Sequence, residues 1–217
     1  IQINAIIEPK KVADSAPDQM PFTRGHKEEN NEWTVFRAYD KNVTNEQLLY
    51  DLNKGISGIE LNLENCDHLE KLLDNVQLEY IHSAFTVSNP DQACKLMGKL
   101  TGKATGWLNF NPIAKDSLIG IDEVLKYTIP RPTFKAFNID GAKVRNQGGT
   151  IIDEIAYLLS CGNEYLNHFQ YTGIEIDLVA ENILFTCGVG PNYFFEIAKI
   201  RALRKLWSNI VAQYKPS

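Results

Sequence analysis

The clearest amphipathic pattern in the chain lies near its end. Apolar residues between positions 197 and 214 recur at helical spacing and form one broad stripe, and Glu196 and Lys199 are assigned to the opposite side. The pattern predicts a helix over residues 194–214. An apolar run at 182–187 and a turn containing two glycines precede it, so the segment is typical of half a β/α unit. The predicted stripe consists of Ile197, Ile200, Leu203, Trp207, Ile210 and Tyr214.

Shorter patterns in the rest of the chain alternate between strand and helix. Thr44 and Thr150 are predicted N-caps of capping boxes, and Ser88 or Asn89, with Pro90 near the first helical position, is the predicted cap of a third helix. Strand and helix alternate at a spacing that predicts the α/β class, with parallel strands joined by helices. Predicted strands cover 33–39, 58–63, 76–85, 106–111, 133–140 and 182–187. Predicted helices cover 44–54, 69–73, 89–100, 121–127, 150–162, 164–171 and 194–214.

Composition narrows the class of protein. The chain has 217 residues, of which 44% are hydrophobic and 23% charged, as is ordinary for a soluble globular domain. A net charge of -5 without a basic cluster argues against a nucleic-acid surface, and no apolar run approaches the roughly 20 residues that cross a bilayer. Four scattered cysteines without a CxxC pair disfavour structural zinc and favour a cytoplasmic location. We expect an N-terminal arm and loop over residues 1–32 and one α/β domain over 33–217, trimmed from or lying within a longer chain.

Several side chains admit both a functional and a structural explanation. His82 lies in an alternating strand and could line a central axis, although a buried, hydrogen-bonded histidine is the more ordinary explanation. Glu60, Glu64 and Asp67 could act as paired carboxylates, or could simply mark a solvated strand end. The glycines of 188–190 resemble part of a phosphate-binding turn, but the third glycine of such a turn is missing.

Three segments carry a family resemblance, and they occur in the family's order. They are PFTRG at 21–25 with WTVFR at 33–37, GGTIIDEIAYLLSCGNEYL at 148–166, and NYFFEIAKIRALRKLW at 192–207. Together they resemble the substrate-binding barrel of the methylmalonyl-CoA mutase family. The resemblance implies a TIM-type (β/α)8 barrel whose axis holds the coenzyme A chain. Because only five or six of eight strands are recognisable, we expect an incomplete barrel.

The residues that active family members need are replaced in this chain. Aligning Gly148–Thr150 with the family's Gly-Ala-Thr places Ala142 and Lys143 at the positions of the catalytic tyrosine and histidine. A lysine can donate a hydrogen bond, but a methyl group cannot replace a phenol. The segment after Arg24 lacks the tyrosine that shields the radical, and Asp67-His68 does not continue into the cobalamin-ligand motif Asp-x-His-x-x-Gly. His68 is therefore expected to be a solvated or capping residue.

The resemblance thus implies a function without catalysis by this chain. It is most similar to the small, non-catalytic subunit of heterodimeric members, which interconvert methylmalonyl-CoA and succinyl-CoA in propionate metabolism. We expect no catalytic, cofactor-binding or metal-binding residues here, and adenosylcobalamin on the catalytic partner subunit. The alternative is a divergent acyl-CoA-binding or mutase-like enzyme. In that case the candidates to face a CoA ester are Arg24, His82 and Lys143. For Arg24 the alternative explanation is a turn-stabilising residue.

In an incomplete barrel the edge strands are left unpaired and the gap between them has to be filled. We expect it to be filled by a further part of the polypeptide, by the partner subunit, or by a second copy of this chain. Contacts are expected along Trp207, Ile210 and Tyr214 if the gap is filled by association, or the arm at Ile1–Ile7 could lie over the open edge.

Overall fold

A computed structural model describes residues 17, 19, 22, 25, 33–63, 68–100, 102–115 and 118–215. The predicted arm at 1–32 lies almost wholly outside these residues, so its boundary stays a prediction. The strands are β1 (Phe36–Tyr39), β2 (Gly58–Asn62), β3 (His82–Thr86), β4 (Thr105–Asn109), β5 (Phe134–Lys135), β6 (Phe137–Asp140) and β7 (Ile183–Thr186). The helices are α1 (Asn45–Asn53), α2 (Leu69–Leu72), α3 (Pro90–Lys99), the 3-10 turn η1 (Pro112–Lys115), α4 (Ile121–Thr128), α5 (Ala142–Asn146), α6 (Ile151–Phe169), α7 (Ile176–Glu181) and α8 (Tyr193–Gln213).

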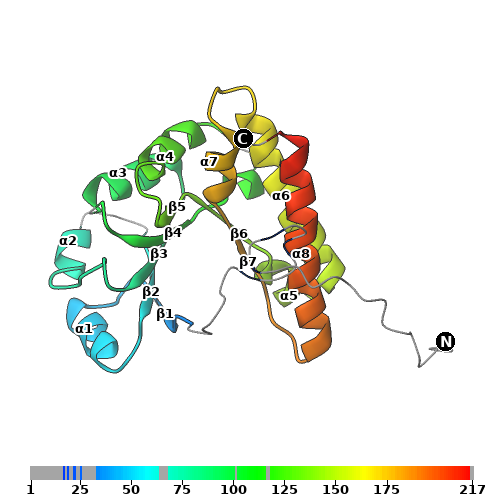
Figure 1. Cartoon of the computed structure of the whole chain (residues 1–217). Coiled ribbons are helices and arrows are strands. Elements are labelled where there is room, and N and C mark those ends of the chain that lie inside the picture. The colour runs from blue at the N-terminus through cyan, green and yellow to red at the C-terminus, as the bar shows by residue number, and fades with distance from the viewer. Residues whose placement is uncertain are drawn as a thin grey trace.

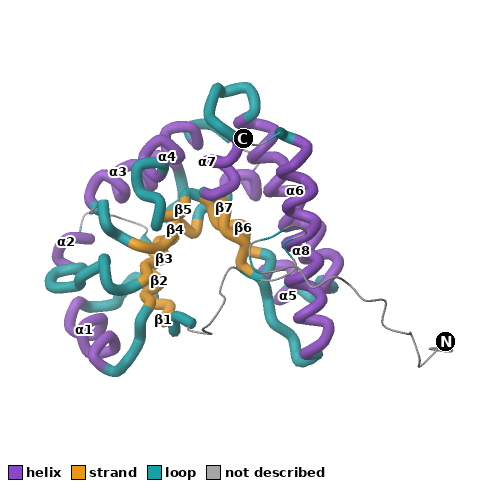
Figure 2. Tube along the Cα trace, viewed as in Figure 1, coloured by secondary structure: helices purple, strands orange, loops and turns teal. Residues whose placement is uncertain are grey.

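The strands form two parallel sheets that follow one arc. Strands β1 to β5 pair in chain order, and β6 pairs with β7. The Asn138 amide donates to the Phe110 carbonyl at 3.2 Å, which joins the end of β4 to β6. Figures 1 and 2 show the helices on the outer, convex side of the arc and an open concave side. The predicted α/β class with parallel strands and helical crossovers is confirmed.

The core lies between the strands and the outer helices. Alternate residues of the strands, such as Ile59, Phe85 and Leu108, are fully buried there. Phe137 of β6 stacks on Tyr165 of α6 with ring centroids 4.6 Å apart. Residues between these positions therefore face the concave side.

Two predicted elements have different limits in the structure. The predicted strand 133–140 is divided at the buried Ala136, because its first part pairs with β4 and its second with β7. The strand predicted to begin at 76 begins only at His82. Gly162 was predicted to end a helix, but α6 continues through it. Close packing explains the glycine there, since a Cβ on Gly162 would lie 2.7 Å from the Trp207 ring.

The buried face of α8 is rotated from the predicted stripe. Glu196 and Lys199, predicted to face solvent, are buried, whereas Ile197 and Ile200 are 41% and 37% exposed. The far half of the stripe was predicted correctly to be apolar and inward-facing. However, Trp207 packs edge-on against Phe185, and the Tyr214 hydroxyl donates to Asn163 Oδ1 at 2.9 Å. These side chains are engaged within the chain, contrary to the expectation that they form its available association surface.

Candidate functional site

A chain of hydrogen bonds runs across the concave face. Asn109 Nδ2 donates to Glu60 Oε1 at 2.8 Å, and Asn138 Nδ2 donates to Asn109 Oδ1 at 2.7 Å. Thr186 Oγ1 donates to Asn138 Oδ1 at 2.8 Å, and Trp107 Nε1 donates to Asn109 Oδ1 at 2.8 Å. We call Glu60, Trp107, Asn109, Asn138 and Thr186 the concave network. It links β2, β4, β6 and β7, and so lines the concave face with polar groups that already have partners.

Most of this network was not predicted from the sequence. Glu60 was considered only as a carboxylate near Glu64 and Asp67, and those two lie outside the described residues. The signal that was missed is the alternation of half-buried and buried positions in 107–110, where Trp107 and Asn109 alternate with the buried Leu108 and Phe110. A polar residue at every second position of an otherwise buried strand predicts a polar face.

Aromatic rings cover the amino end of the same face. The Phe36 ring lies 4.9 Å from Trp107 and 6.4 Å from His82, measured between centroids. Phe36 rests on Gly58, where a Cβ would lie 2.7 Å from the ring. His82 shares a register row with Gly58 and is exposed, so its explanation as a buried core histidine is wrong.

At the carboxyl end, the two residues aligned with the family's catalytic pair begin the short helix α5. The Ala142 amide donates to Asp140 Oδ1 at 3.1 Å, so Ala142 contributes backbone and a methyl group. Lys143 Nζ lies 3.7 Å from Asp140 Oδ2, and the lysine side chain is 76% exposed. His82 and Lys143 therefore stand at opposite ends of the strands. Arg24 lies outside the described residues.

A buried ionic cluster lies behind α5, where α6, α8 and the loop after β7 meet. We call Arg145, Glu154, Glu196 and Lys199 the ionic cluster. Lys199 Nζ lies 3.0 Å from Glu154 Oε2 and 2.5 Å from Glu196 Oε2, and it also donates to the Gly188 carbonyl. Glu154 Oε1 accepts from the Gly188 amide at 2.6 Å, and Arg145 Nε lies 3.9 Å from Glu154 Oε2. The cluster fastens the β7–α8 loop to α5 and α6.

The charges of the cluster stabilise one another. Burial alone favours a neutral lysine, but the hydrogen bonds to Glu196 and Glu154 outweigh it and raise the pKa of Lys199. The hydrogen bond from Lys199 also lowers the pKa of the Glu196 carboxyl. Both groups therefore stay charged at neutral pH.

The glycines of 188–190 have a packing explanation within this cluster. A Cβ on Gly188 would lie 3.1 Å from Arg145 Cβ, and one on Gly190 would lie 3.0 Å from Glu196 Oε1. The close approach of the loop to the charged side chains accounts for both glycines without a phosphate ligand.

The described residues contain no metal-binding group of three or more His, Cys, Asp or Glu side chains. Within the same residues, no helix is long and apolar enough to span a membrane. Burial, followed by the charge of Glu154, raises the pKa of the Cys187 thiol to about 11, which keeps it protonated and weakly nucleophilic. His68 is exposed at the N-cap of α2 and makes no capping hydrogen bond.

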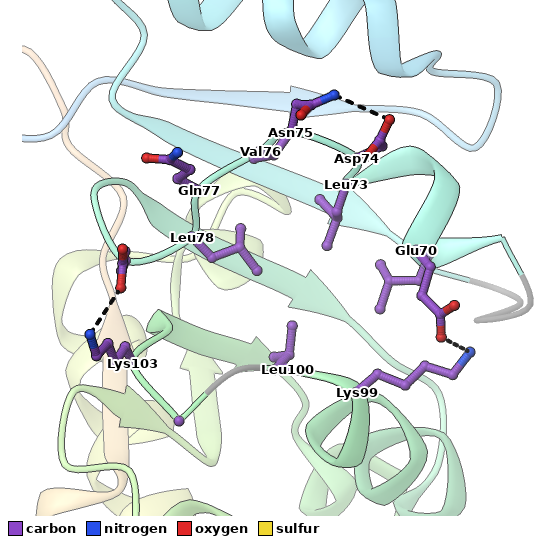
Figure 3. Close-up of a pocket in the computed structure, with 13 residues that line it drawn as sticks. Glu70, Leu73, Asp74, Asn75, Val76, Gln77, Leu78, Lys99, Leu100 and Lys103 are labelled. Atoms are coloured by element: carbon purple, nitrogen blue, oxygen red, sulfur yellow. Dashed lines mark hydrogen bonds and ion pairs between the residues drawn. The ribbon is translucent and has the colours of Figure 1, made fainter.

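A groove among the described residues lies outside the concave face. It has a volume of about 730 Å³, between the α2–β3 connection and the end of α3. Figure 3 shows its apolar floor, which includes Leu78 and Leu100, and ion pairs on its rim. Lys99 and Glu70 are 3.4 Å apart, and Lys103 and Glu79 are 3.5 Å apart. None of the groove's lining residues belongs to the concave network.

Comparison with known proteins identifies the family. The family model for methylmalonyl-CoA mutase matches residues 109–217, which is half of the chain. The methylmalonyl-CoA mutase small subunit of Porphyromonas gingivalis is 31% identical over 234 residues, covering 96% of this chain and 38% of that protein. The large subunit of Streptomyces virginiae is 36% identical over 103 residues, or 47% of this chain and 14% of its own length. The probable large subunit of Mycobacterium bovis is 38% identical with the same coverage. The chain thus spans less than two fifths of the length of that small subunit, although nearly all of the chain is matched. The chain belongs to the methylmalonyl-CoA mutase family.

Proposed function

We propose that this chain is part of the non-catalytic small subunit of a heterodimeric methylmalonyl-CoA mutase and acts as a structural partner of the catalytic subunit. The small subunit from P. gingivalis matches 96% of the chain, whereas the large subunits from S. virginiae and M. bovis match 47%. The observation that carries the proposal is the carboxyl end of β6. There a methyl group and a lysine paired with Asp140 occupy the positions that the resemblance assigns to the catalytic tyrosine and histidine.

The proposal also includes a closed barrel as the complete fold. We infer that the arc of parallel strands is a sector of a (β/α)8 barrel, with the concave network facing the axis. Two observations support this inference: the hydrogen bond between Asn138 and Phe110 that joins the two sheets, and the side-chain chain from Glu60 to Thr186 that crosses the join.

Adenosylcobalamin is assigned to the partner subunit in this proposal. None of the described histidines lies in the family's Asp-x-His-x-x-Gly motif. His68 is exposed at a helix start, His82 lies beside Phe36, and His168 Nε2 pairs with Asp122 at 3.3 Å. The assembled cytoplasmic enzyme would interconvert methylmalonyl-CoA and succinyl-CoA in propionate metabolism, with the chemistry performed by the partner.

The test is co-expression of the tagged chain with a mutase large subunit from the same organism. We expect the large subunit to elute with the chain, and the chain alone to retain no corrinoid and to isomerise no methylmalonyl-CoA when adenosylcobalamin is supplied. Loss of one transition-state donor alone costs about a hundred- to a thousandfold in rate. Isomerisation by the pure chain above background, or a stoichiometric corrinoid spectrum on gel filtration, would refute the proposal.

A second candidate function is binding of a CoA ester along the concave face. It is favoured by the exposed His82 beside two aromatic rings at one end of the face and by the Lys143 amine at the other. Calorimetric titration of the chain with methylmalonyl-CoA tests it. Binding that is weakened by His82→Ala and not by His168→Ala, a histidine of the outer helices, would support this function. No heat of binding would exclude it.

A further inference from the structure

The first turns of α8 expose several large apolar side chains. Tyr193, Phe194 and Phe195 are 71%, 79% and 62% exposed, and Ile197 and Ile200 follow at 41% and 37%. Of these residues, Tyr193, Ile197 and Ile200 share one flank of the helix because they stand at i, i+4 and i+7, whereas Phe194 and Phe195 project to other sides. Apolar side chains that gather on one exposed flank indicate an interaction site, which singly scattered ones do not.

Part of this surface is a straight stripe along one flank of the helix. Tyr193, Ile197, Ile200 and Arg204 stand at i, i+4, i+7 and i+11, so they lie above one another on the helix surface. These four side chains line a groove of about 450 Å³ together with Val189, Glu196 and Arg201, and Gly25 borders the groove beside the Arg204 guanidinium. We call these four residues the α8 flank. It lies beside the buried face formed by Glu196, Lys199 and Leu203, and α6 packs on the helix elsewhere.

The order of residues in the α8 flank is self-complementary. Tyr193 precedes Ile197 by four positions, and Arg204 follows Ile200 by four positions. If two such helices pack antiparallel about the midpoint between the isoleucines, Ile197 meets Ile200 of the other copy. Tyr193 then meets Arg204 of the other copy, which is a favourable cation–π pair. A two-fold axis makes each of these contacts twice, as in most homodimers.

From this pattern we propose that the α8 flank is an interaction surface for a second copy of this chain, packed as an antiparallel helix pair. The proposal does not rest on the proposed function, because it needs only the residues of α8. The exposed area on each copy is below the roughly 800 Å² of a standard interface, so the dimer is weak and its population depends on protein concentration.

Sedimentation at concentrations from low micromolar to millimolar tests the proposal. We expect reversible dimerisation of the unmodified chain, and a dissociation constant at least about tenfold higher for Ile197→Glu, because the carboxylate would be buried against Ile200 of the other copy. Leu206→Glu is the matched control, since Leu206 is 42% exposed on the opposite flank of the same helix. It should leave both dimerisation and the melting temperature unchanged.

A charge-rescue experiment tests the antiparallel register itself. Ile197→Glu and Ile200→Lys should each weaken self-association, whereas an equimolar mixture of the two variants should form a heterodimer, since the introduced carboxylate of one chain would face the introduced amine of the other. A strictly monomeric unmodified chain, an equal effect of Ile197→Glu and Leu206→Glu, or failure of the mixture to associate would overturn the proposal. Association with a large subunit through α8 in the absence of any self-association would overturn it as well, while leaving the proposed function standing.

Discussion

Replacing Lys199 by methionine should destabilise the chain more than any exposed lysine replacement. The side chains of Lys199 and Glu154 are both 0% exposed, and the lysine is the closest cation to Glu154 and to Glu196. Without it, the partners that Glu154 keeps among the described residues are the Gly188 amide at 2.6 Å and Arg145 at 3.9 Å. Breaking a buried ion pair by removing one partner costs about 3–5 kcal/mol of unfolding free energy. For a domain of this size the melting temperature should fall by about 10 °C.

The matched control is Lys143→Met, which makes the same chemical change at a side chain that is 76% exposed and paired at 3.7 Å. Such a surface pair contributes about 0–1 kcal/mol. Urea denaturation followed by circular dichroism measures both variants. The double variant Glu154→Gln with Lys199→Met should recover much of the loss, because glutamine still accepts from Gly188 but carries no buried charge. Equal unfolding free energies for the two lysine variants, or no recovery in the double variant, would refute the argument.

The pH dependence of the same comparison has a definite sign. The lowered pKa of Glu196 means that its contribution is present above its ordinary value of 4.5 and is lost as the pH falls below it. The raised pKa of Lys199 means that its contribution is complete below its ordinary value of 10.5 and is lost as the pH rises through the folded-state value. The difference in stability between the unmodified chain and Lys199→Met should therefore be greatest between these limits and shrink on both sides.

Two further predictions concern packing and the concave network. Gly162→Ala should lower the free energy of unfolding by about 1–3 kcal/mol, because its Cβ would lie 2.7 Å from the Trp207 ring. Gly98→Ala in α3, where a Cβ would meet nothing within 4 Å, should be neutral or stabilising. Thermal melts compare the two variants, and equal effects would contradict the packing argument. Asn109→Leu should cost about 1–3 kcal/mol in urea denaturation, since it removes the partner of Glu60, Trp107 and Asn138. The control is Asn167→Leu, on the exposed side of α6, which should change the stability in urea little. An equally small effect of Asn109→Leu would show that water replaces the network.

Local signals along the chain were sufficient for most elements. The N-cap predicted at Thr150 is a complete capping box, with Asp153 accepting from the Thr150 amide at 2.8 Å. Of the two caps predicted for α3, Ser88 and Asn89, the structure has Asn89. These features depend on residues three or four positions apart, so the sequence contains them directly. The short helices α5 and α7 have too few turns to show a periodic pattern, and neither was predicted.

The errors arose where two distant segments decide the environment of a residue. A charged side chain is normally assigned to solvent, and Glu196 and Lys199 were assigned there although they stand at i and i+3 and lead directly into the stripe of Leu203 and Trp207. What reverses the assignment is Glu154, 45 positions away from Lys199, which supplies the countercharge. The rotation of α8 follows from that pairing: burying Glu196 and Lys199 moves Ile197 and Ile200 out to the flank. The apolar surface that remains exposed is therefore a consequence of the ionic cluster, and a sequence pattern that places every charge outside cannot locate it.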